Sequence, residues 1–360
     1  MFPRIFRPIS ATACVIGVLV LLGPVTAMRA LAQYVPASNL DPAASTIRLD
    51  SSFQDDAWLV YTYEVDAQGA VVNAQVRRSN KVPALEQALL EQVRAMRFAP
   101  ATRNGEPVTS QANPIVYTWI LDKPRQLGPQ FSELYRQAWD HFSAQDYRAA
   151  QTIAAQLADY PGRNALEEVK SRLLSASLAH RLNEAAAELR HLQRVVDFQR
   201  LALDNNFKNV YVPPEQFLKV LDRILSLQLE ANSLGDAGFT LDTMQALARG
   251  EPLVEAASSR YVSAEQALQN AGAFAIEGEL IPLYPEGPAA WKTALSQREF
   301  YIADVRGRVS SVYLACSGGE RLLTWPSKEH WRVPAGWSDC KVDVSGTAGT
   351  RLLLHQVVSR

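Results

Sequence analysis

The sequence WLVYTYEVDAQG, residues 58–69, begins the part of the chain whose pattern is clearest. Apolar side chains alternate along it and form one row on a single face of a strand, namely Leu59, Tyr61, Tyr63 and Val65. Asp66 to Gly69 reads as a turn, because glycine adopts a positive φ at little cost. Residues 72–77 alternate again, so the stretch predicts two neighbouring strands joined by a tight turn.

A helix and a last strand are predicted to follow this pair. Pro83 suits the first position of a helix, because the N–H that proline lacks would have no helical partner there. Apolar residues then recur at helical spacing and form one stripe, which consists of Leu85, Leu89, Val93 and Met96. Residues 97–100 end the helix, residues 104–107 form a turn, and Ile115 to Leu121 form the last strand. The expected order is β-β-α-β.

Three blocks of this stretch resemble the C-terminal domain of TonB, the energy transducer of Gram-negative envelopes. The blocks are Tyr63 to Gly69 with Val71, Met96 to Ala101, and Asn104 to Val108. Their order, and the phase of the helix between them, match the family over a small part of the chain. We therefore expect a TonB-like domain over residues 45–122. An unrelated small β-β-α-β domain is the alternative.

The resemblance implies where a partner binds. In the TonB family the last strand lies at a sheet edge and accepts an extended peptide from an outer-membrane transporter. Such an edge offers unpaired main-chain N–H and C=O groups to a second chain. The partner-binding residues implied here are Ile115, Tyr117, Thr118, Trp119 and Leu121. The alternative is that the linker or the first helix covers this edge and the aromatic residues only pack.

Residues 1–32 have the pattern of a signal peptide. Arg4 and Arg7 precede an apolar run from Ala11 to Leu22, and Ala30 to Ala32 offers a cleavage site. The run is shorter than the ~20 residues that a membrane span needs. We expect export to the periplasm with cleavage after residue 32. An uncleaved inner-membrane anchor facing the periplasm is the alternative, and membrane contact is expected only in that case.

The middle of the chain reads as helical. Residues 122–129 form a linker rich in Pro and Gly, after which the apolar period changes to that of helices. Ala138, Ala150 and Pro161 occupy places typical of a tetratricopeptide-like helix pair, and Arg181 to Ala186 begins a weaker second copy. Helices further along do not repeat the motif. We expect a TPR-like array over residues 130–270, which would present a surface to protein partners. A generic helical spacer is the alternative.

Residues 273–360 return to strands separated by turns. The β-rich runs are residues 300–305, 309–316, 321–325 and 352–358. They predict a small antiparallel β domain of the sandwich kind. Its tryptophans, Trp325, Trp331 and Trp337, could bind carbohydrate or peptide, although such residues more often cap a small core. Cys316 and Cys340 are the only cysteines outside the signal segment, which predicts a disulfide in an exported protein.

Composition and motifs give little support to catalysis or to nucleic-acid binding. The formal net charge is −1 and no basic stripe is present. The sequence holds no nucleophile elbow, zinc-protease motif, phosphate-binding loop or dinucleotide fingerprint. Its histidines lack the spacing of metal ligands, so neither a metal nor a cofactor is expected. Glu277 and Glu279 alternate near the start of the β domain, and convergent acids in a pocket with a displaced pKa would indicate an enzyme.

The whole sequence predicts an α+β multidomain, non-catalytic periplasmic protein of the cell envelope. It would hold protein partners or extended peptides through the TonB-like domain and the helical array. The first alternative is a membrane-anchored transducer acting on outer-membrane transport. Against it, no histidine precedes His141 to couple to a proton-driven motor, and the family's long proline-rich arm is missing. The second alternative is an envelope enzyme whose site lies in the C-terminal β domain.

Overall fold

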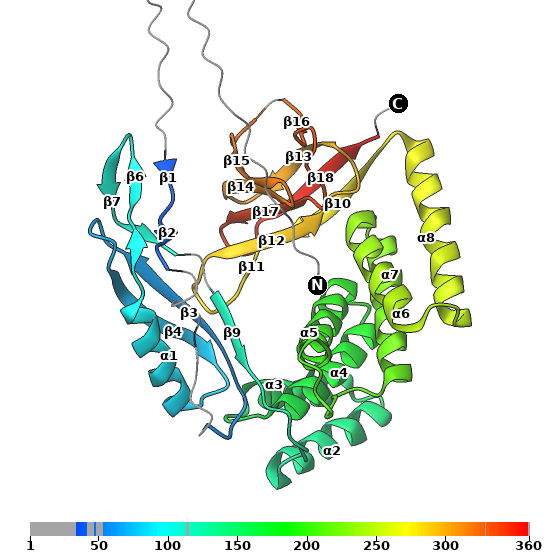
Figure 1. Ribbon diagram of the computed structural model, residues 1–360. Coiled ribbons are helices and arrows are strands. Elements are labelled where there is room, and N and C mark those ends of the chain that lie inside the picture. Colours follow the sequence, from blue (N-terminus) through cyan, green and yellow to red (C-terminus); the bar gives the residue numbers. More distant parts are fainter. Residues whose placement is uncertain (1–33, 42–46, 48–52, 113–114, 328, 359–360) are drawn as a thin grey trace, which may run out of the picture.

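The computed structural model describes residues 34–41, 47, 53–112, 115–327 and 329–358. These residues form an N-terminal domain (residues 34–119), a helical domain (residues 129–271) and a C-terminal sandwich (residues 273–358). Figure 1 shows the three arranged around a central space, with the helical domain curving from below the N-terminal domain up to the sandwich. The expected α+β multidomain fold is confirmed. The predicted signal segment, residues 1–32, lies outside the described residues.

Strand β3 (Ala57–Val65) is the centre of the N-terminal domain. It pairs with β4 (Val71–Ser79) on one side and with β8 (Ser110–Gln111) and β9 (Ile115–Trp119) on the other. Helix α1 (Pro83–Ala95) begins at the predicted proline and buries Leu85, Leu89 and Val93. The predicted row of β3 is confirmed, since these side chains lie in the domain's core: Leu59, Tyr61, Tyr63 and Val65.

A small hairpin extends the N-terminal domain. It consists of β6 (Ala101–Arg103) and β7 (Glu106–Val108), joined by Asn104 and Gly105, which both have positive φ, 56° and 86°. Strand β1 (Tyr34–Val35) pairs with β6, and β2 (Ser38–Asn39) pairs with β5 (Phe98–Ala99). The pairing of this domain therefore begins before residue 45, where the sequence placed its start.

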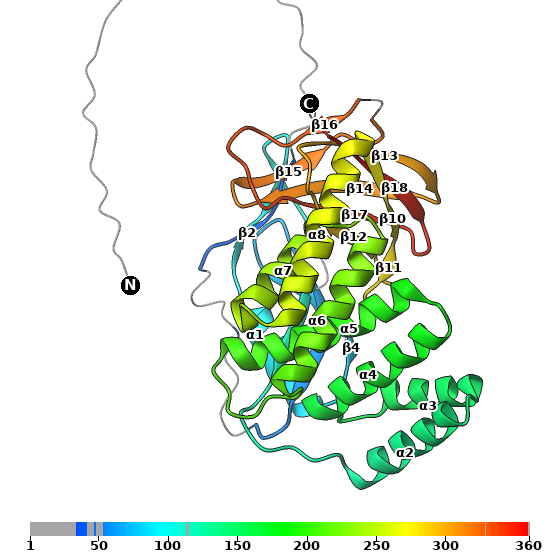
Figure 2. The same cartoon turned by 90° about the vertical axis from the view of Figure 1, so that its right-hand side faces the viewer.

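The helical domain is built from hairpins that share one turn geometry. Its helices are α2 (Pro129–Ser143), α3 (Tyr147–Asp159), α4 (Ala165–Arg181), α5 (Ala185–Asp204), α6 (Pro214–Glu230), α7 (Leu234–Ala248) and α8 (Pro252–Ala271). The α2–α3, α4–α5 and α6–α7 turns each hold a left-handed residue, which is Gln145, Asn183 or Asn232. Figure 2 shows α6, α7 and α8 side by side below the sandwich.

Hydrogen bonds repeat at each of these turns. In α6–α7, Asn232 donates its N–H to the carbonyl of Leu229, three residues back, and Ser233 donates to Gln228, five back. The corresponding pairs at the other two turns are Gln145 with Phe142, Asp146 with His141, Asn183 with His180, and Glu184 with Ala179. This is the Schellman pattern, which satisfies the last carbonyls of a helix. The same bonds also end α5, at Asn206 and Phe207. The tight hairpin occurs three times in the described chain, although the α6–α7 sequence does not show the repeat.

The C-terminal domain consists of two antiparallel sheets around one core. One sheet has the order β10 (Ala273–Glu279), β18 (Arg351–Val357), β13 (Glu299–Arg306), β16 (Trp331–Arg332). The other has the order β11 (Ile281–Pro282), β12 (Ala289–Ala294), β17 (Lys341–Gly346), β14 (Val309–Cys316), β15 (Gly319–Leu323). Both contribute to the same apolar cluster, so this domain is the expected sandwich. Trp325, Trp331 and Trp337 pack against that cluster, as core-capping residues do.

Cys316 and Cys340 form the predicted disulfide. It links the end of β14 to the residue before β17, and these two strands are neighbours in one sheet. Replacing both cysteines with serine is expected to lower the free energy of unfolding by about 3 kcal/mol, because the bridge restricts the unfolded chain. Denaturant titrations of the two proteins measure the difference. Equal midpoints without reductant would contradict this expectation, whereas reductant should remove the difference by opening the bridge in the wild type.

Trp58 anchors the N-terminal domain in the helical domain. Its indole packs edge-on against Phe198 of α5, with 5.3 Å between the ring centroids. The guanidinium carbon of Arg163 lies 5.3 Å from the centre of the same indole. Trp58 is only 7% exposed and belongs to one apolar cluster with residues of α4 to α8. The helical domain therefore covers this end of β3 on the face turned away from α1.

Asp56 fixes the same contact between the N-terminal and helical domains through hydrogen bonds. This region, around Asp56 and Trp58, is called the joint below. Its carboxylate accepts from Nε and Nη2 of Arg125, at 2.6 Å each, and from the N–H of Leu121 at 3.1 Å. It also accepts from the N–H of Ala165, at 2.9 Å, in the first turn of α4. A carboxylate is stabilised at a helix N-terminus by the unpaired N–H groups and the helix dipole. Asp56 thus joins the N-terminal domain, the linker and the helical domain.

Asn80 supports this joint from the end of β4. Its amide nitrogen donates to the carbonyls of Asp56 (2.8 Å) and Arg163 (3.0 Å), and its Oδ1 accepts from the N–H of Trp58 (3.1 Å). Its own carbonyl accepts from the N–H of Gly162. Asn80 is 1% exposed, so these bonds are shielded from water. The N-terminal domain and the α3–α4 turn are therefore held in one fixed arrangement.

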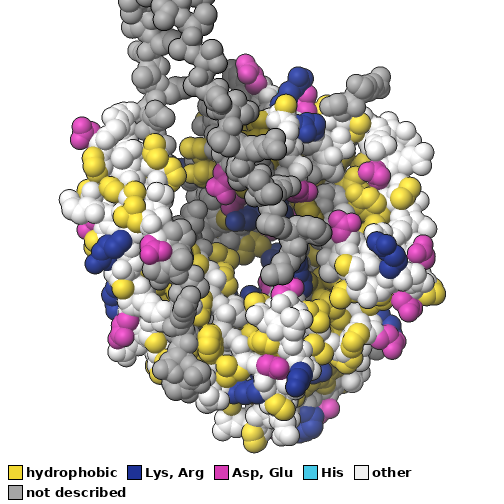
Figure 3. Space-filling model, in the orientation of Figure 1, with side chains coloured by type: hydrophobic (Ala, Val, Ile, Leu, Met, Phe, Trp, Pro, Cys, Tyr) yellow, Lys and Arg dark blue, Asp and Glu magenta, His cyan; other side chains and the backbone are white. Residues whose placement is uncertain are grey.

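Two further contacts join the sandwich to the other domains. Asp236 in α7 accepts from Oγ1 of Thr293 (2.7 Å) and from the N–H of Ala294 (3.2 Å) in β12. Arg77 of β4 lies over the ring of Tyr284, 5.7 Å from its centre. The three domains therefore close into a ring. The space-filling view shows this face hollowed between them (Figure 3).

Candidate partner-binding site

Strand β9 is the edge strand on which the sequence placed the partner. Among the described strands it pairs with β3 alone, in the register Ala57 with Trp119 through Tyr61 with Ile115. Its other side faces the space between the domains in Figure 1. The strand ends at Trp119 rather than at Leu121, because the N–H of Leu121 is bound by the side chain of Asp56 instead of a strand.

The hydrogen bonds around β3 show which groups of β9 point outward. In an antiparallel pair, N–H and C=O of one residue point to the same side, and the side alternates along the strand. The main chain of Trp58 bonds on the β4 side. Its carbonyl accepts from the N–H of Asn80, and its N–H donates to Oδ1 of Asn80. Thr118 lies opposite Trp58. The N–H and C=O of Thr118 therefore point away from β3, to the open edge.

An independent bond gives the same result. The carbonyl of Tyr63 accepts from the N–H of Ala112, which lies on the β8–β9 side. The main-chain N–H and C=O groups of the odd-numbered residues of β3 therefore point to that side. Tyr117 and Trp119, opposite Leu59 and Ala57, are then the β9 residues that bond to β3. Val116 shares the outward direction of Thr118. Its side chain is 47% exposed, the most open on the strand, and the sequence did not single it out.

The side chains of the predicted site divide between two faces. Ile115, Tyr117 and Trp119 pack against the domain's own apolar clusters on the α1 side. Ile120, just after the strand, packs against the core of the helical domain. Trp119 Nε1 is buried and has no hydrogen-bond partner among the described residues. The structure thus brings the predicted residues together on one edge. Whether Tyr117 and Trp119 select a partner sequence stays a prediction.

The tyrosine side chains at and beside β9 are neutral. Burial raises the pKa of Tyr117 above its ordinary value. Burial, with the neighbouring phenols of Tyr63 and Tyr117, raises the pKa of Tyr61 to about 12. These phenols are therefore uncharged at neutral pH. A partner at β9 would be held by main-chain hydrogen bonds and apolar contact, so its binding should depend little on salt.

Asp236 is relevant to the enzyme alternative, because it lines a cavity together with Glu277 and Glu279. Burial raises the pKa of Asp236, while hydrogen bonds from Thr293 and Ala294 oppose the shift. Both of its carboxylate oxygens accept these bonds, which join α7 to β12. The structure therefore gives this acid a role in holding two domains together. No group of three His, Cys, Asp or Glu side chains in the described residues is arranged to hold a metal ion.

Sequence comparison finds a match in the N-terminal domain. No curated protein matches the chain. One family model matches 62 residues, which include β3 from its second residue, β4, α1 and β9 and leave out the helical domain and the sandwich. The matched residues contain every main-chain group that the geometry assigns to the open edge. Residues 58–119 thus match the family model of the Gram-negative bacterial TonB protein C-terminal, which indicates a TonB-like envelope protein that makes protein interactions.

Proposed function

We propose that this chain is a non-catalytic periplasmic protein that binds an extended segment of a protein partner along β9. The outward N–H and C=O groups of Val116 and Thr118 carry the proposal, because a second chain can pair with them as an added strand. An outer-membrane transporter is a fitting partner, since TonB C-terminal domains interact with such proteins. Cleavage after residue 32 would release the protein into the periplasm.

The rest of the chain supports a role as a scaffold. The repeated helical hairpins resemble a tetratricopeptide-like array, and stacked hairpins of this kind present extended surfaces to partners. The joint at Asp56 and Trp58 holds β9 in a fixed orientation relative to that array. Such preorganisation reduces the entropy lost when a partner binds.

None of the described helices is long and apolar enough to cross a membrane.

Replacing Thr118 with proline tests the proposal. The substitution removes an N–H that points to the open edge and leaves the β3–β9 hydrogen bonds in place. Losing one main-chain bond should weaken partner capture by at least about 5-fold. Capture is measured by quantitative mass spectrometry of partners retained from a Gram-negative envelope extract. The thermal midpoint should stay within about 3 °C of the wild type, because no native bond is lost.

Two matched variants complete this experiment. Thr118→Ala keeps the outward N–H and should capture the partner as well as the wild type does. Tyr117→Pro removes an N–H that bonds to β3 and should lower the thermal midpoint clearly. If Thr118→Pro captures the same partner undiminished while folding normally, partner binding along β9 is wrong.

A further inference from the structure

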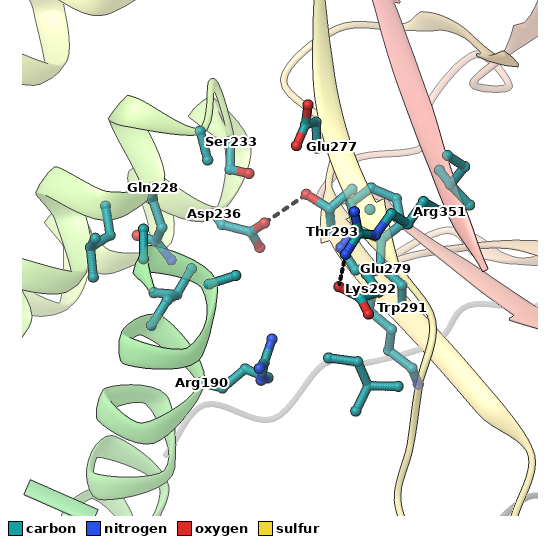
Figure 4. Close-up of a pocket in the computed structure, with 18 of the residues that line it drawn as sticks. Arg190, Gln228, Ser233, Asp236, Glu277, Glu279, Trp291, Lys292, Thr293 and Arg351 are labelled. Atoms are coloured by element: carbon teal, nitrogen blue, oxygen red, sulfur yellow. Dashed lines mark hydrogen bonds and ion pairs between the residues drawn. The ribbon is translucent and has the colours of Figure 1, made fainter. Parts of the chain in front are cut away.

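A cavity of about 700 Å³ lies between the helical domain and the sandwich. Figure 4 shows its two walls, with helices on one side and strands β10 and β12 on the other. The helical wall mixes apolar residues, such as Ala185, Leu189 and Leu227, with polar ones, such as Gln193 and Gln228. The volume lies within the range of pockets that bind ligands, ~300–1,000 Å³. Neither the β9 site nor the matched family region includes these residues.

Strand β10 turns an open edge toward this cavity. Among the described strands it pairs with β18 alone. Leu280, just after the strand, donates its N–H to the carbonyl of Thr350, and its carbonyl accepts from the N–H of Gly349. The main-chain N–H and C=O groups of even-numbered residues therefore point to the β18 side. Alternation then directs N–H and C=O of Glu277 and Glu279 to the open side. Both residues line the cavity.

The helical domain caps this edge at one end only. Asn232, in the α6–α7 turn, donates its side-chain amide to the carbonyl of Ala275 at 3.3 Å, which shows that the β10 edge faces the helices. Asp236 similarly accepts the N–H of Ala294 at the end of β12. Beyond these caps, the main-chain groups of Glu277 and Glu279 have no partner in the described part of the chain. The edge is thus docked at one end and open along the cavity.

Charges of both signs on the cavity walls lack partners among the described residues. Arg190 on α5 and Glu277 on β10 form no hydrogen bond or ion pair with any described residue, and Figure 4 shows them on opposite walls. Asp304 and Arg306 of β13 also line the cavity without an ion pair to any described residue. Lys292 and Arg351 are partly neutralised, since Lys292 lies 2.8 Å from Asp343 and Arg351 lies 3.9 Å from Glu279. A ligand with one acidic and one basic group would complement Arg190 and Glu277, which lie on opposite walls.

We propose that this cavity is a second peptide-binding site, in which an extended polypeptide segment adds to the edge of β10. Its main chain pairs with the outward groups of Glu277 and Glu279. A basic side chain directly opposite Glu277 lies beside that carboxylate, as cross-strand neighbours do. An acidic side chain of the same segment reaches Arg190. The site is independent of β9, so the chain binds two segments at once.

The test uses the purified chain and a displayed library of random linear ten-residue peptides. The wild type should enrich sequences that share one acidic and one basic position. Selection on Arg190→Glu should replace the acidic preference with a basic one, and selection on Glu277→Lys should replace the basic preference with an acidic one. Such an exchange of preferences reports direct contact, which a purely structural role of either residue would not produce.

Main-chain pairing is tested on the best wild-type peptide. Glu277→Gln removes only the charge and should weaken binding about 3-fold. Glu277→Pro also removes the outward N–H and should weaken binding about 10-fold or more. The bonds to β18 come from even-numbered residues and remain, so both variants should fold. Arg181→Glu, a charge change in α4 outside the cavity, is the control and should bind like the wild type.

Several results would overturn the proposal. One is a selection that enriches no sequence. Another is a set of peptides that bind the wild type, Arg190→Glu and Glu277→Lys alike. A third is a set of peptides lost in Thr118→Pro but retained in both cavity variants, because those peptides occupy β9. Retained binding in Thr118→Pro together with loss in the cavity variants supports this site whatever the outcome at β9.

Discussion

Replacing Asp56 with alanine is expected to lower the free energy of unfolding by about 3–5 kcal/mol, because the change leaves a buried arginine without its counter-ion. The Arg125 side chain is 4% exposed and the Asp56 side chain is fully buried. Arg125 also donates to the carbonyls of Lys123 and Leu121, but these neutral acceptors do not balance its charge. Chemical denaturation of the two proteins measures the loss.

The same variant should loosen the N-terminal domain from the helical domain. Without the carboxylate, the N–H groups of Leu121 and Ala165 lose their acceptor, and the end of β9 is no longer fixed to α4. Protease cleavage in the linker, residues 122–128, should become faster than in the wild type. Tryptophan fluorescence should shift to longer wavelength if Trp58 becomes exposed to water.

Asp55→Ala is the matched control, since Asp55 is the exposed neighbour of Asp56. Surface substitutions of this kind usually change stability by less than ~0.5 kcal/mol. An Asp56→Ala protein as stable and as protease-resistant as the control would show that this ion pair does not hold the joint. The apolar contact between Trp58 and Phe198 would then hold it alone.

The sequence predicted the interior of the N-terminal domain because that interior follows local periodicity. The alternation in β3 and the stripe of α1 reappear as one cluster. It did not predict that the opposite face of β3 is also covered, because the covering residues lie far along the chain. Asp56 and Ala165 are 109 residues apart, and nothing in the local pattern around either residue signals their contact.

Repeats and short strands escaped prediction for different reasons. The α6–α7 hairpin shares its turn geometry with the earlier pairs, but only the left-handed residue, Asn232, marks it in the sequence. Strand β12 reads AAWKTA, and alanine and lysine are poor strand formers. It is a strand because β17 pairs along its whole length, in the register Ala289 with Gly346 through Ala294 with Lys341. Tertiary pairing here outweighs local preference.

The position of the candidate strand could be predicted from the sequence, but which of its main-chain groups are open to a partner could not. Ile115 to Trp119 is where the sequence placed it. Which N–H groups point outward depends on the register with β3, and the bond from Asn80 to Trp58 fixes that side. The cavity beside β10 could not be predicted at all, since α5 and β10 lie apart in the sequence and only the closed ring brings them together.

Glu168→Gln is expected to be as destabilising as the loss of Asp56. The Glu168 carboxylate is almost fully buried and lies 2.6 Å from Arg163, 2.8 Å from Arg172 and 3.8 Å from Arg194. Removing its charge leaves three guanidinium groups close together, and among the described residues only Asp197, 3.7 Å from Arg194, still forms an ion pair with one of them. Breaking a buried ion pair on one side typically costs about 3–5 kcal/mol.

A surface ion pair provides the comparison for this variant. Glu215 lies 2.9 Å from Lys219 on the exposed face of α6, so Glu215→Gln breaks a pair that water already screens. Exposed pairs of this kind contribute roughly 0–1 kcal/mol. Denaturant titrations at neutral pH should therefore separate the two glutamine variants clearly. Similar losses in both would mean that the arginines around Glu168 are stabilised by other groups.

Acid titration then separates Glu168 from His191. Burial would raise the pKa of Glu168, but the surrounding arginines outweigh it and hold that pKa below its ordinary value. The stability from Glu168 is thus present above pH 4.5, the ordinary value, and is lost as pH falls through the folded pKa.

Burial, with Arg172 and Arg190, lowers the pKa of His191 from 6.5 to about 4. The unfolded chain therefore takes up a proton at His191 before the folded protein does, and the protein loses stability as pH falls from 6.5 to about 4. The Glu168 charge opposes the shift of the His191 pKa, so Glu168→Gln should lose at least as much stability as the wild type between pH 6.5 and 4 and should show less loss below that range. A variant that loses stability below pH 4 as steeply as the wild type would show that other carboxylates dominate acid unfolding.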